Sequence, residues 1–600
     1  MKGLLRAGLL AATCASFFST VAATPPRRDG HHRRSACHSQ KNHTDKVTVD
    51  LGYEVHQGTL NRTGSFFTFS NVPYAEQPIG DLRFQKPVTI TGQASAAVNK
   101  GSDEDVKCMQ AYPKWMIELF AGGSTSDLAA VTAQLTGASG QTESCLVLDV
   151  RVPVNVFKAR TSAQAPVLVW IHGGGFTYGS KSSDGDPAGL IARSQADKGE
   201  GIIFVSINYR LGLFGWLGGG DDVTPNLGLY DQRLALEWVK QYIGQFGGSP
   251  NRVTVMGESA GAASIVHHIT AYGGVGAPAP FQSAIPQSPA FQFNINLTAG
   301  YEMTLAKASS QTGVGIRDVK TLSTLESDTL KSINQDVVYG APTGMFNFGP
   351  GPDGTYVLKL PQVLLLEGGF DHSVNLMISH TANESVPFTP FNISTAADVR
   401  ARAKFSLPEA SDATLSTLLT RVYPDVLDGG STSGAMGTAT AYPWATQFAR
   451  AAQITTETSF ACTTRFLATA FGNATRNYIF AYPPAYHAAD LPYVFFGSEE
   501  EEEDGRGAVD ADLARALQGY IVAFARTGDP NRDNPGVSAT SAGNGGSSST
   551  TASRLRPEFP TYGAGGAVLR LTPGGFEFGV DDMMNGRCAW IQRAMADGLL

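Results

Sequence analysis

Apolar residues along the chain form short continuous runs that alternate with longer stretches of helical period. The short runs are rich in β-branched residues, which is typical of buried parallel strands. They cover 167–171, 202–207, 252–256, 376–379 and 478–480. The stretches 231–246 and 512–526 place their apolar residues on one helical face. This alternation predicts an α/β fold with a mostly parallel central sheet and helices on both of its faces.

The N-terminus has the pattern of a secretory signal. Lys2 and Arg6 precede a short apolar run, and small residues at Ala22 and Ala23 suit cleavage after residue 23. The alternative, a membrane anchor, is disfavoured because the run is shorter than the roughly 20 apolar residues that span a bilayer. We therefore predict a signal peptide at 1–23, a polar tail at 24–46 and one large α/β domain at 47–600.

Charge and cysteine content narrow the partners and the compartment. The net charge of -8 argues against a nucleic-acid partner, which would require a basic face. Five cysteines follow the predicted cleavage site, and an oxidising compartment would let four of them form two bridges, with Cys37 left in the polar tail. Together with six glycosylation sequons, this predicts a secreted, extracellular glycoprotein. No pattern in the chain sets an oligomeric state.

Gly257-Glu-Ser-Ala-Gly261 matches the pattern G-x-S-x-G. A predicted strand precedes it and a predicted helix, 262–269, follows it, so Ser259 would stand at a sharp strand-to-helix turn. Small flanking residues leave room for that turn, and the helix N-terminus favours developing negative charge. The alternative is a chance glycine-rich turn, but the flanking elements favour Ser259 as a nucleophile.

A glycine run follows the strand at 167–171. In His172-Gly-Gly-Gly-Phe176, the backbone N–H groups of Gly174 and Gly175 would join the N–H of Ala260 as donors to an oxyanion. The alternatives are a flexible turn or a phosphate-binding loop, but the latter would need a following Gly-Lys-Ser/Thr.

Chain order selects the base and the acid. In folds with this nucleophile turn the order is serine, acid, histidine. His487 is the one histidine beyond residue 380, and Glu384 follows the strand at 376–379. His372 and His380 are weaker rivals for the base, and Asp398 is the runner-up for the acid.

Several separated motifs resemble one known family. They are 69–84, 143–149, 208–212, 226–233 and 246–250, together with the nucleophile block. From about residue 47 onward the chain is similar to the type-B carboxylesterase/lipase family, which includes cholinesterases and fungal lipases, with the α/β-hydrolase fold.

The resemblance implies a function and a set of site residues. It implies a triad of Ser259, Glu384 and His487, with Gly174, Gly175 and Ala260 as oxyanion donors. It also implies an Arg83–Glu143 ion pair, a second carboxylate at Glu258 and a hydroxyl at Ser288 near the histidine. The implied disulfides are Cys108–Cys145 and Cys462–Cys588. We expect a secreted carboxylic ester hydrolase that forms an acyl-enzyme on apolar esters, without metal or cofactor. Candidate pocket residues are Phe176, Phe291, Phe293 and Phe346.

The segment between Cys108 and Cys145 is apolar at helical spacing. It is interpreted either as a mobile lid that opens at a lipid surface or as fixed helices packed on the body. The first interpretation belongs to an alternative function, a triacylglycerol or sterol-ester lipase with transient lipid contact. The second alternative is an inactive binding or adhesion relative, which the presence of all three triad residues disfavours.

Overall fold

The computed structural model describes most of the chain. The described residues are 46–92, 97–102, 104–122, 127–196, 200–276, 278–292, 296–427, 444–497, 509–532 and 556–600. The predicted signal peptide, the tail with Cys37, the acidic run 499–504 and the Ser/Gly-rich segment 537–553 lie outside them. Within the described residues, no helix combines the length and hydropathy needed to cross a bilayer.

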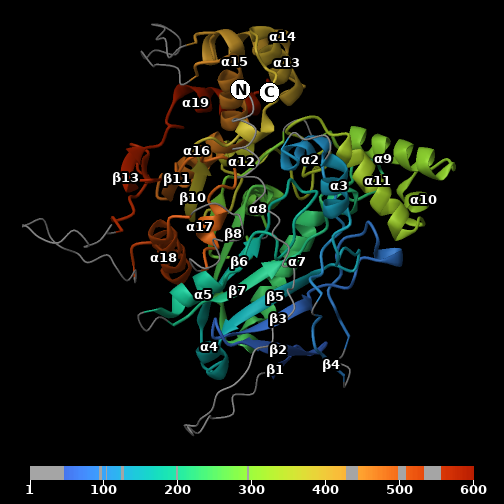
Figure 1. The fold of residues 1–600 in the computed structure, drawn as a ribbon, viewed down its shortest axis with the longest axis vertical. Coiled ribbons are helices and arrows are strands. Elements are labelled where there is room, and N and C mark those ends of the chain that lie inside the picture. The colour runs from blue at the N-terminus through green and yellow to red at the C-terminus, as the bar shows by residue number, and fades with distance from the viewer. Residues whose placement is uncertain are drawn as a thin grey trace, which may run out of the picture.

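One sheet forms the centre of the molecule (Figure 1). Its strand order is β1-β2-β3-β5-β7-β6-β8-β9-β10-β11-β12-β13, with β4 paired to β2. Strands β7 to β12 in this order are parallel, the strands at both ends of the order are antiparallel, and the short β4 pairs with β2 in parallel. The parallel strands are β6 (Ala165–Ile171), β7 (Ile203–Ile207), β8 (Gly248–Glu258), β9 (Ser283–Gln287), β10 (Asn375–Thr381), β11 (Arg476–Phe480) and β12 (Ala567–Thr572). The others are β1 (Lys46–Asp50), β2 (Val55–Asn61), β3 (Phe66–Pro73), β4 (Val98–Asn99), β5 (Val147–Pro153) and β13 (Gly575–Val580). The predicted α/β-hydrolase architecture is confirmed.

Helices cover both faces of this sheet because its central strands are apolar on both sides. All residues of β6 and β7 are buried. Alternate residues of β6 enter separate cores, since side chains alternate across a strand. Val167 and Val169 pack with α7 (Leu227–Tyr242) and α8 (Ala260–Ile269), whereas Leu168 and Trp170 pack with α5 (Ala188–Gln195) and α18 (Ala511–Thr527).

The structure corrects several predicted bounds. The helix expected at 231–246 begins at Leu227 and ends at Tyr242, where a short 3-10 turn continues to Phe246. Strand β9 was not predicted, because Pro286 interrupts its short apolar pattern and proline is unusual within a sheet. The antiparallel edge strands were not predicted either, since their patterns mix buried and exposed positions.

Two further groups of helices lie above the sheet. In Figure 1, α13, α14 and α15 gather at the top of the view, and α9, α10 and α11 lie to one side, beside α2 and α3. Their bounds are α2 (Lys114–Phe120), α3 (Leu128–Thr136), α9 (Leu297–Thr312), α10 (Val319–Ser323), α11 (Ser327–Tyr339), α13 (Ala396–Ser406), α14 (Asp412–Thr417) and α15 (Gln447–Thr456). The remaining helices are α4 (Val154–Lys158), α6 (Gly212–Trp216), α12 (Pro361–Glu367), α16 (Cys462–Ala470), α17 (Leu491–Val494) and α19 (Gly586–Ala596).

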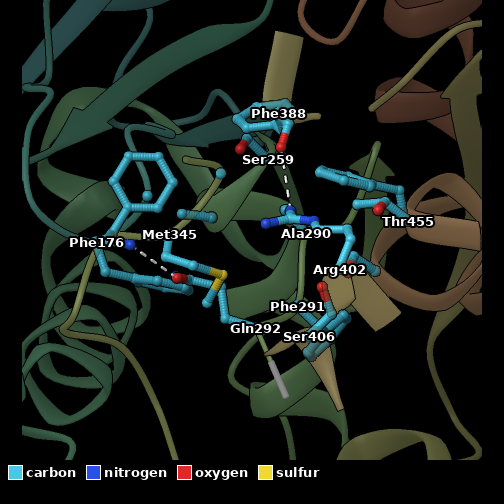
Figure 2. A pocket seen from close by; sticks show the side chains of 16 residues that line it. Phe176, Ser259, Ala290, Phe291, Gln292, Met345, Phe388, Arg402, Ser406 and Thr455 are labelled. Atoms are coloured by element: carbon cyan, nitrogen blue, oxygen red, sulfur yellow. Dashed lines mark hydrogen bonds between the residues drawn. The ribbon is translucent and has the colours of Figure 1, made fainter. Parts of the chain in front are cut away.

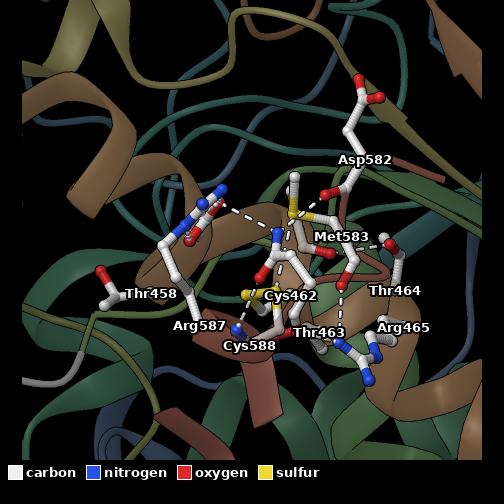
Figure 3. Close-up of a disulfide and its surroundings, with 12 residues drawn as sticks. Thr458, Cys462, Thr463, Thr464, Arg465, Asp582, Met583, Arg587 and Cys588 are labelled. Atoms are coloured by element: carbon white, nitrogen blue, oxygen red, sulfur yellow. Dashed lines mark hydrogen bonds and ion pairs between the residues drawn. A yellow bond between two sulfur atoms is a disulfide. The ribbon is translucent and has the colours of Figure 1, made fainter. Parts of the chain in front are cut away.

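Both disulfides implied by the family resemblance are present. Cys108–Cys145 closes the segment that carries α2 and α3, and Cys462–Cys588 ties α16 to α19 (Figure 3). Glu457 lies near the second bridge and pairs with Arg587 at 2.5 Å. Because both thiols are bonded to each other, this group is not a metal site.

The implied Arg83–Glu143 ion pair is also present. The Arg83 guanidinium donates from Nε at 2.7 Å and from Nη2 at 2.6 Å to the two carboxylate oxygens. It also donates to the backbone carbonyl of Leu325, so it fastens the N-terminal block to the helices above the sheet.

Candidate active site

Ser259 occupies the turn between β8 and α8 with a φ of 56° and a ψ of -120°. Such a backbone is strained for a residue with a side chain, so the surroundings must hold it. Its N–H donates to the carbonyl of Gln287 on β9 at 3.0 Å. A Cβ on Gly261 would lie 2.0 Å from the Ile171 carbonyl oxygen, and one on Gly257 would lie 2.7 Å from the same atom. The two glycines of the motif therefore allow the turn to pack against β6.

Glu384 and His487 meet because they follow neighbouring parallel strands. Glu384 follows β10 and His487 follows β11, and the carboxyl ends of these strands meet at one edge of the sheet. His487 Nδ1 lies 2.6 Å from Glu384 Oε2. Glu384 is fully buried, and its other oxygen accepts the N–H of Thr381 at 2.6 Å.

The environment of Glu384 favours its charged form. Burial opposes ionisation, but the charge of His487 and hydrogen bonds from His487 and the Thr381 N–H together hold the pKa of Glu384 below its usual range. Ser288, which follows β9, is fully buried, and its hydroxyl forms no hydrogen bond within the described residues. An ionised carboxylate at Nδ1 fixes the imidazole tautomer and leaves Nε2 to face the cleft.

The other imidazole nitrogen lies beside Glu258. His487 Nε2 is 3.2 Å from Glu258 Oε1. Within the described part of the chain no hydrogen bond joins the Ser259 hydroxyl to His487, although both residues line the same cleft. Such bonds are often long in enzymes without substrate and tighten in the complex.

Two further carboxylates were missed by the sequence analysis. Burial raises the pKa of Asp184 to about 6, and burial with the charge of Glu384 raises the pKa of Asp490 to about 7. Burial and the charges of Asp490 and Asp184 hold the pKa of Glu258 well above its usual range. Glu258, Glu384 and Asp490 are buried and Asp184 is half-buried, and Glu384 is the one whose surroundings stabilise the anion. Of these carboxylates, only Glu258 and Glu384 were nominated from the sequence. Glu258 adjoins Ser259 in the G-x-S-x-G motif, and Glu384 follows a predicted strand.

The three predicted oxyanion donors line cavities that Ser259 also lines. Gly174 and Gly175 follow β6 with φ of 101° and 57°, and Ala260 begins α8. A Cβ would lie 2.0 Å from the Tyr178 carbonyl oxygen at Gly174 and 2.5 Å from the Phe346 ring at Gly175. None of the three N–H groups donates a hydrogen bond within the described residues.

The rival residues lie elsewhere. His380 is buried within β10, where its Nδ1 lies 3.3 Å from the Thr464 hydroxyl, and His372 is near the exposed carbonyl of Gly368. Asp398 forms a capping box with Thr395 at the start of α13. None of these side chains reaches Ser259 in the described structure.

Two hollows adjoin Ser259. A wide cleft of about 830 Å³ contains Ser259, Glu258 and His487 and extends past α2. A small cavity of about 40 Å³ also adjoins Ser259 (Figure 2). Of the predicted pocket residues, Phe176, Phe291 and Phe346 line the small cavity, and Phe293 lies outside the described residues.

Comparisons with known proteins all identify carboxylesterases and lipases as similar to this chain. The sequence model of the Carboxylesterase family matches residues 51–552. The chain is 36% identical over 513 residues to carboxylesterase patB of Penicillium expansum, which covers 80% of this chain and 88% of that one. It is 31% identical to lipase 1 of Geotrichum candidum, over 80% and 86% of the two chains. The crystal structure of Aspergillus niger EstA superposes with a TM-score of 0.70 at 23% identity, covering 92% and 99%.

Proposed function

We propose that Ser259, His487 and Glu384 catalyse ester hydrolysis in this chain, which belongs to the carboxylesterase family. Membership of this family and the named relatives make the chain a carboxylic ester hydrolase. The observation that carries the proposal is the 2.6 Å contact between Glu384 and His487 Nδ1, beside a serine in a strained turn. Serine is a weak nucleophile until a base removes its proton, and an imidazole oriented by a carboxylate supplies that base.

In the acylation step, Ser259 Oγ attacks the ester carbonyl carbon while His487 Nε2 takes its proton. The carbonyl oxygen becomes an oxyanion that accepts hydrogen bonds from the N–H groups of Gly174, Gly175 and Ala260, each worth about 3 kcal/mol of barrier. The intermediate collapses, the bond to the alcohol oxygen breaks, and His487 donates the proton to the leaving alcohol. The acyl group remains esterified to Ser259.

In the deacylation step, His487 removes a proton from a water molecule that attacks the acyl-enzyme. The second oxyanion occupies the same donors. Collapse breaks the bond to Ser259 Oγ, which regains its proton from His487, and the carboxylic acid is released. Glu384 remains ionised throughout and stabilises the imidazolium formed in each step.

The test compares Ser259→Ala with Ser264→Ala. Ser264 is a buried serine on the same helix, and its hydroxyl donates to the Ala260 carbonyl. Ser259→Ala should lower kcat/KM for a p-nitrophenyl ester by at least about 10³-fold, whereas Ser264→Ala should stay within a few-fold of wild type. Retained activity in folded Ser259→Ala would refute the nucleophile, and loss in both variants would point to a defect of the helix.

A lipase function is the second candidate. Trp115, Met116, Leu119 and Phe120 of α2 line the wide cleft, which would give a lipid a contact surface if α2 moved. A panel of p-nitrophenyl esters of increasing chain length distinguishes the two functions. An esterase loses activity from butyrate to palmitate, whereas a lipase gains it and is activated when the ester passes its solubility limit.

We also propose that the protein is secreted. Two disulfides, which persist in oxidising compartments, and relatives such as the secreted lipase 1 of Botryotinia fuckeliana support this. Detection of the mature chain, beginning near residue 24, in culture medium would test it. Retention of the chain in the cell would contradict it.

A further inference from the structure

The small cavity beside Ser259 contains a buried cation. Arg402 of α13 is 8% exposed and lines this cavity with Ser259 and Ala260 (Figure 2). It is the one charged residue among the described residues that line it, and the others are mostly aromatic or small. A guanidinium in an apolar cavity is costly unless an anion or several acceptors accompany it.

The described protein satisfies this cation only in part. Arg402 Nη1 donates to the carbonyl of Thr343 at 2.8 Å, and Nη2 donates to the carbonyl of Phe388 at 3.1 Å. Its Nε is buried and has no hydrogen-bond partner in the described chain, and the same holds for the hydroxyl of Ser406. No carboxylate in the described residues forms an ion pair with Arg402. Burial alone lowers the pKa of Arg402 to about 10, so it remains a cation at neutral pH.

The two unsatisfied groups lie on one face of α13. Arg402 and Ser406 are one helical turn apart, and both line the cavity. Gly344 lets the guanidinium approach, because a Cβ there would lie 2.8 Å from Nη2. A planar guanidinium beside a hydroxyl is the donor set that recognises a carboxylate.

The proposed reaction identifies which part of the ester enters this cavity. His487 must protonate the leaving alcohol, and His487 lines the wide cleft, whereas it is absent from the residues that line the small cavity. The alcohol therefore leaves on the wide side and the acyl group occupies the small one. One water needs about 10–15 Å³ by this measure, so about 40 Å³ holds a short acyl group.

We infer that the acyl cavity selects half-esters of short dicarboxylic acids, with Arg402 and Ser406 binding the free carboxylate. This inference rests on the proposed function, because it assigns the acyl side from the role of His487. The aromatic lining accommodates the methylene spacer, and the alcohol of such a half-ester can be large because it lies in the wide cleft.

The test uses monobenzyl malonate, succinate and glutarate, with benzyl levulinate as the neutral counterpart of the succinate, in which a methyl ketone replaces the carboxylate. Release of benzyl alcohol is measured for wild type, Arg402→Met, Arg402→Lys and Arg450→Met. Arg450 is the matched control, since it is also buried and donates to the carbonyls of Tyr423 and Leu419, outside the cavity.

Wild type should prefer the best half-ester over benzyl levulinate by at least tenfold in kcat/KM. Arg402→Met should abolish this preference, Arg402→Lys should keep part of it, and Arg450→Met should keep all of it. An arginine that only fastens the loops at Thr343 and Phe388 would lower activity on both esters equally and leave their ratio unchanged. An unchanged ratio in Arg402→Met, or no preference in wild type, would overturn the inference.

If Arg402→Met does not fold, inhibition of the wild-type enzyme by competing compounds tests the inference instead. Monomethyl succinate or monomethyl glutarate should inhibit hydrolysis of benzyl acetate at least tenfold more strongly than neutral methyl levulinate does, and equal inhibition would overturn the inference. Hydrolysis of benzyl acetate by wild type and its loss in Ser259→Ala report on the proposed function separately.

Discussion

At the scale of single residues, the site depends on glycines, because their lack of a side chain leaves room for the backbone around Ser259. Gly257 and Gly261 let the turn at Ser259 pack on β6, and Gly174 and Gly175 adopt positive φ where a Cβ would collide with Tyr178 and Phe346. Any side chain at Gly261 must displace backbone of β6, which the sheet resists because β6 is paired on both sides.

Gly261→Ala should therefore destabilise the protein. Its Cβ would lie 2.0 Å from the Ile171 carbonyl oxygen, and overpacking of this kind costs about 1 to 3 kcal/mol. Gly244→Ala is the control, since a Cβ there meets nothing within 4 Å. Thermal unfolding should show a Tm below that of the wild type for Gly261→Ala and an unchanged Tm for Gly244→Ala. Equal Tm values for the two variants would contradict the packing argument.

The buried carboxylates give a pH-dependent prediction. Asp490 is fully buried with a pKa raised to about 7, so its ionisation costs stability. The cost is absent below the unfolded pKa near 4, grows as pH rises, and is complete above about 7. Each pKa unit corresponds to about 1.4 kcal/mol, so the cost is at most about 4 kcal/mol.

Asp490→Asn removes this ionisation and should raise Tm relative to wild type at pH 8 but not at pH 4. Glu367→Gln, which changes an exposed carboxylate of α12, is the control and should keep the pH dependence of wild type. Thermal unfolding from pH 4 to pH 8 measures both. A stabilisation by Asp490→Asn that is equal at all pH values would show that the charge is not its cause.

At the scale of elements, the segment 108–145 forms part of the cleft wall. Trp115 of α2 donates from its indole N–H to the Met345 carbonyl at 2.9 Å and packs edge-on against Phe346 and Phe388. Cys108–Cys145 joins the ends of the segment. The described structure thus holds α2 against the small cavity by aromatic packing, and the disulfide restricts the segment in the unfolded chain.

Replacing Cys108 and Cys145 with serine should lower the free energy of unfolding by about 4 kcal/mol, from the entropy of closing a loop of 37 residues. The same change at Cys462 and Cys588 releases a loop of 126 residues and should cost about 5 kcal/mol. Denaturant unfolding of both variants measures which of the two losses in free energy of unfolding is larger. Unchanged stability after loss of the first bridge would contradict this account of the segment.

Apolar sequence patterns predicted most of the parallel strands but misplaced the start of α7 and missed β9. Strands β6, β7, β8, β10 and β11 were predicted because strands buried on both faces are continuous apolar runs. The start of α7 was placed too late, because Asn226 precedes it in a left-handed conformation, with a φ of 59°, and forms no side-chain cap. Strand β9 was missed for its proline, although its end holds the N–H of Ser259.

At the scale of the whole molecule, the parallel sheet brings distant residues together. Ser259, Glu384 and His487 follow β8, β10 and β11, so chain order and strand ends were enough to nominate them. Arg402 and Asp490 were not nominated, since no motif marks them and their significance comes from burial. Burial beside a reactive centre is a property of tertiary packing, which a single sequence does not display.

The central claim is that Ser259 is the activated nucleophile, and its most direct test is covalent labelling. A fluorophosphonate probe reacts with serines whose hydroxyl is deprotonated by a neighbouring base, and peptide mass spectrometry locates the adduct. One adduct on Ser259 is predicted, with labelling lost in His487→Ala. An adduct on another serine, or undiminished labelling of Ser259 in His487→Ala, would contradict the claim.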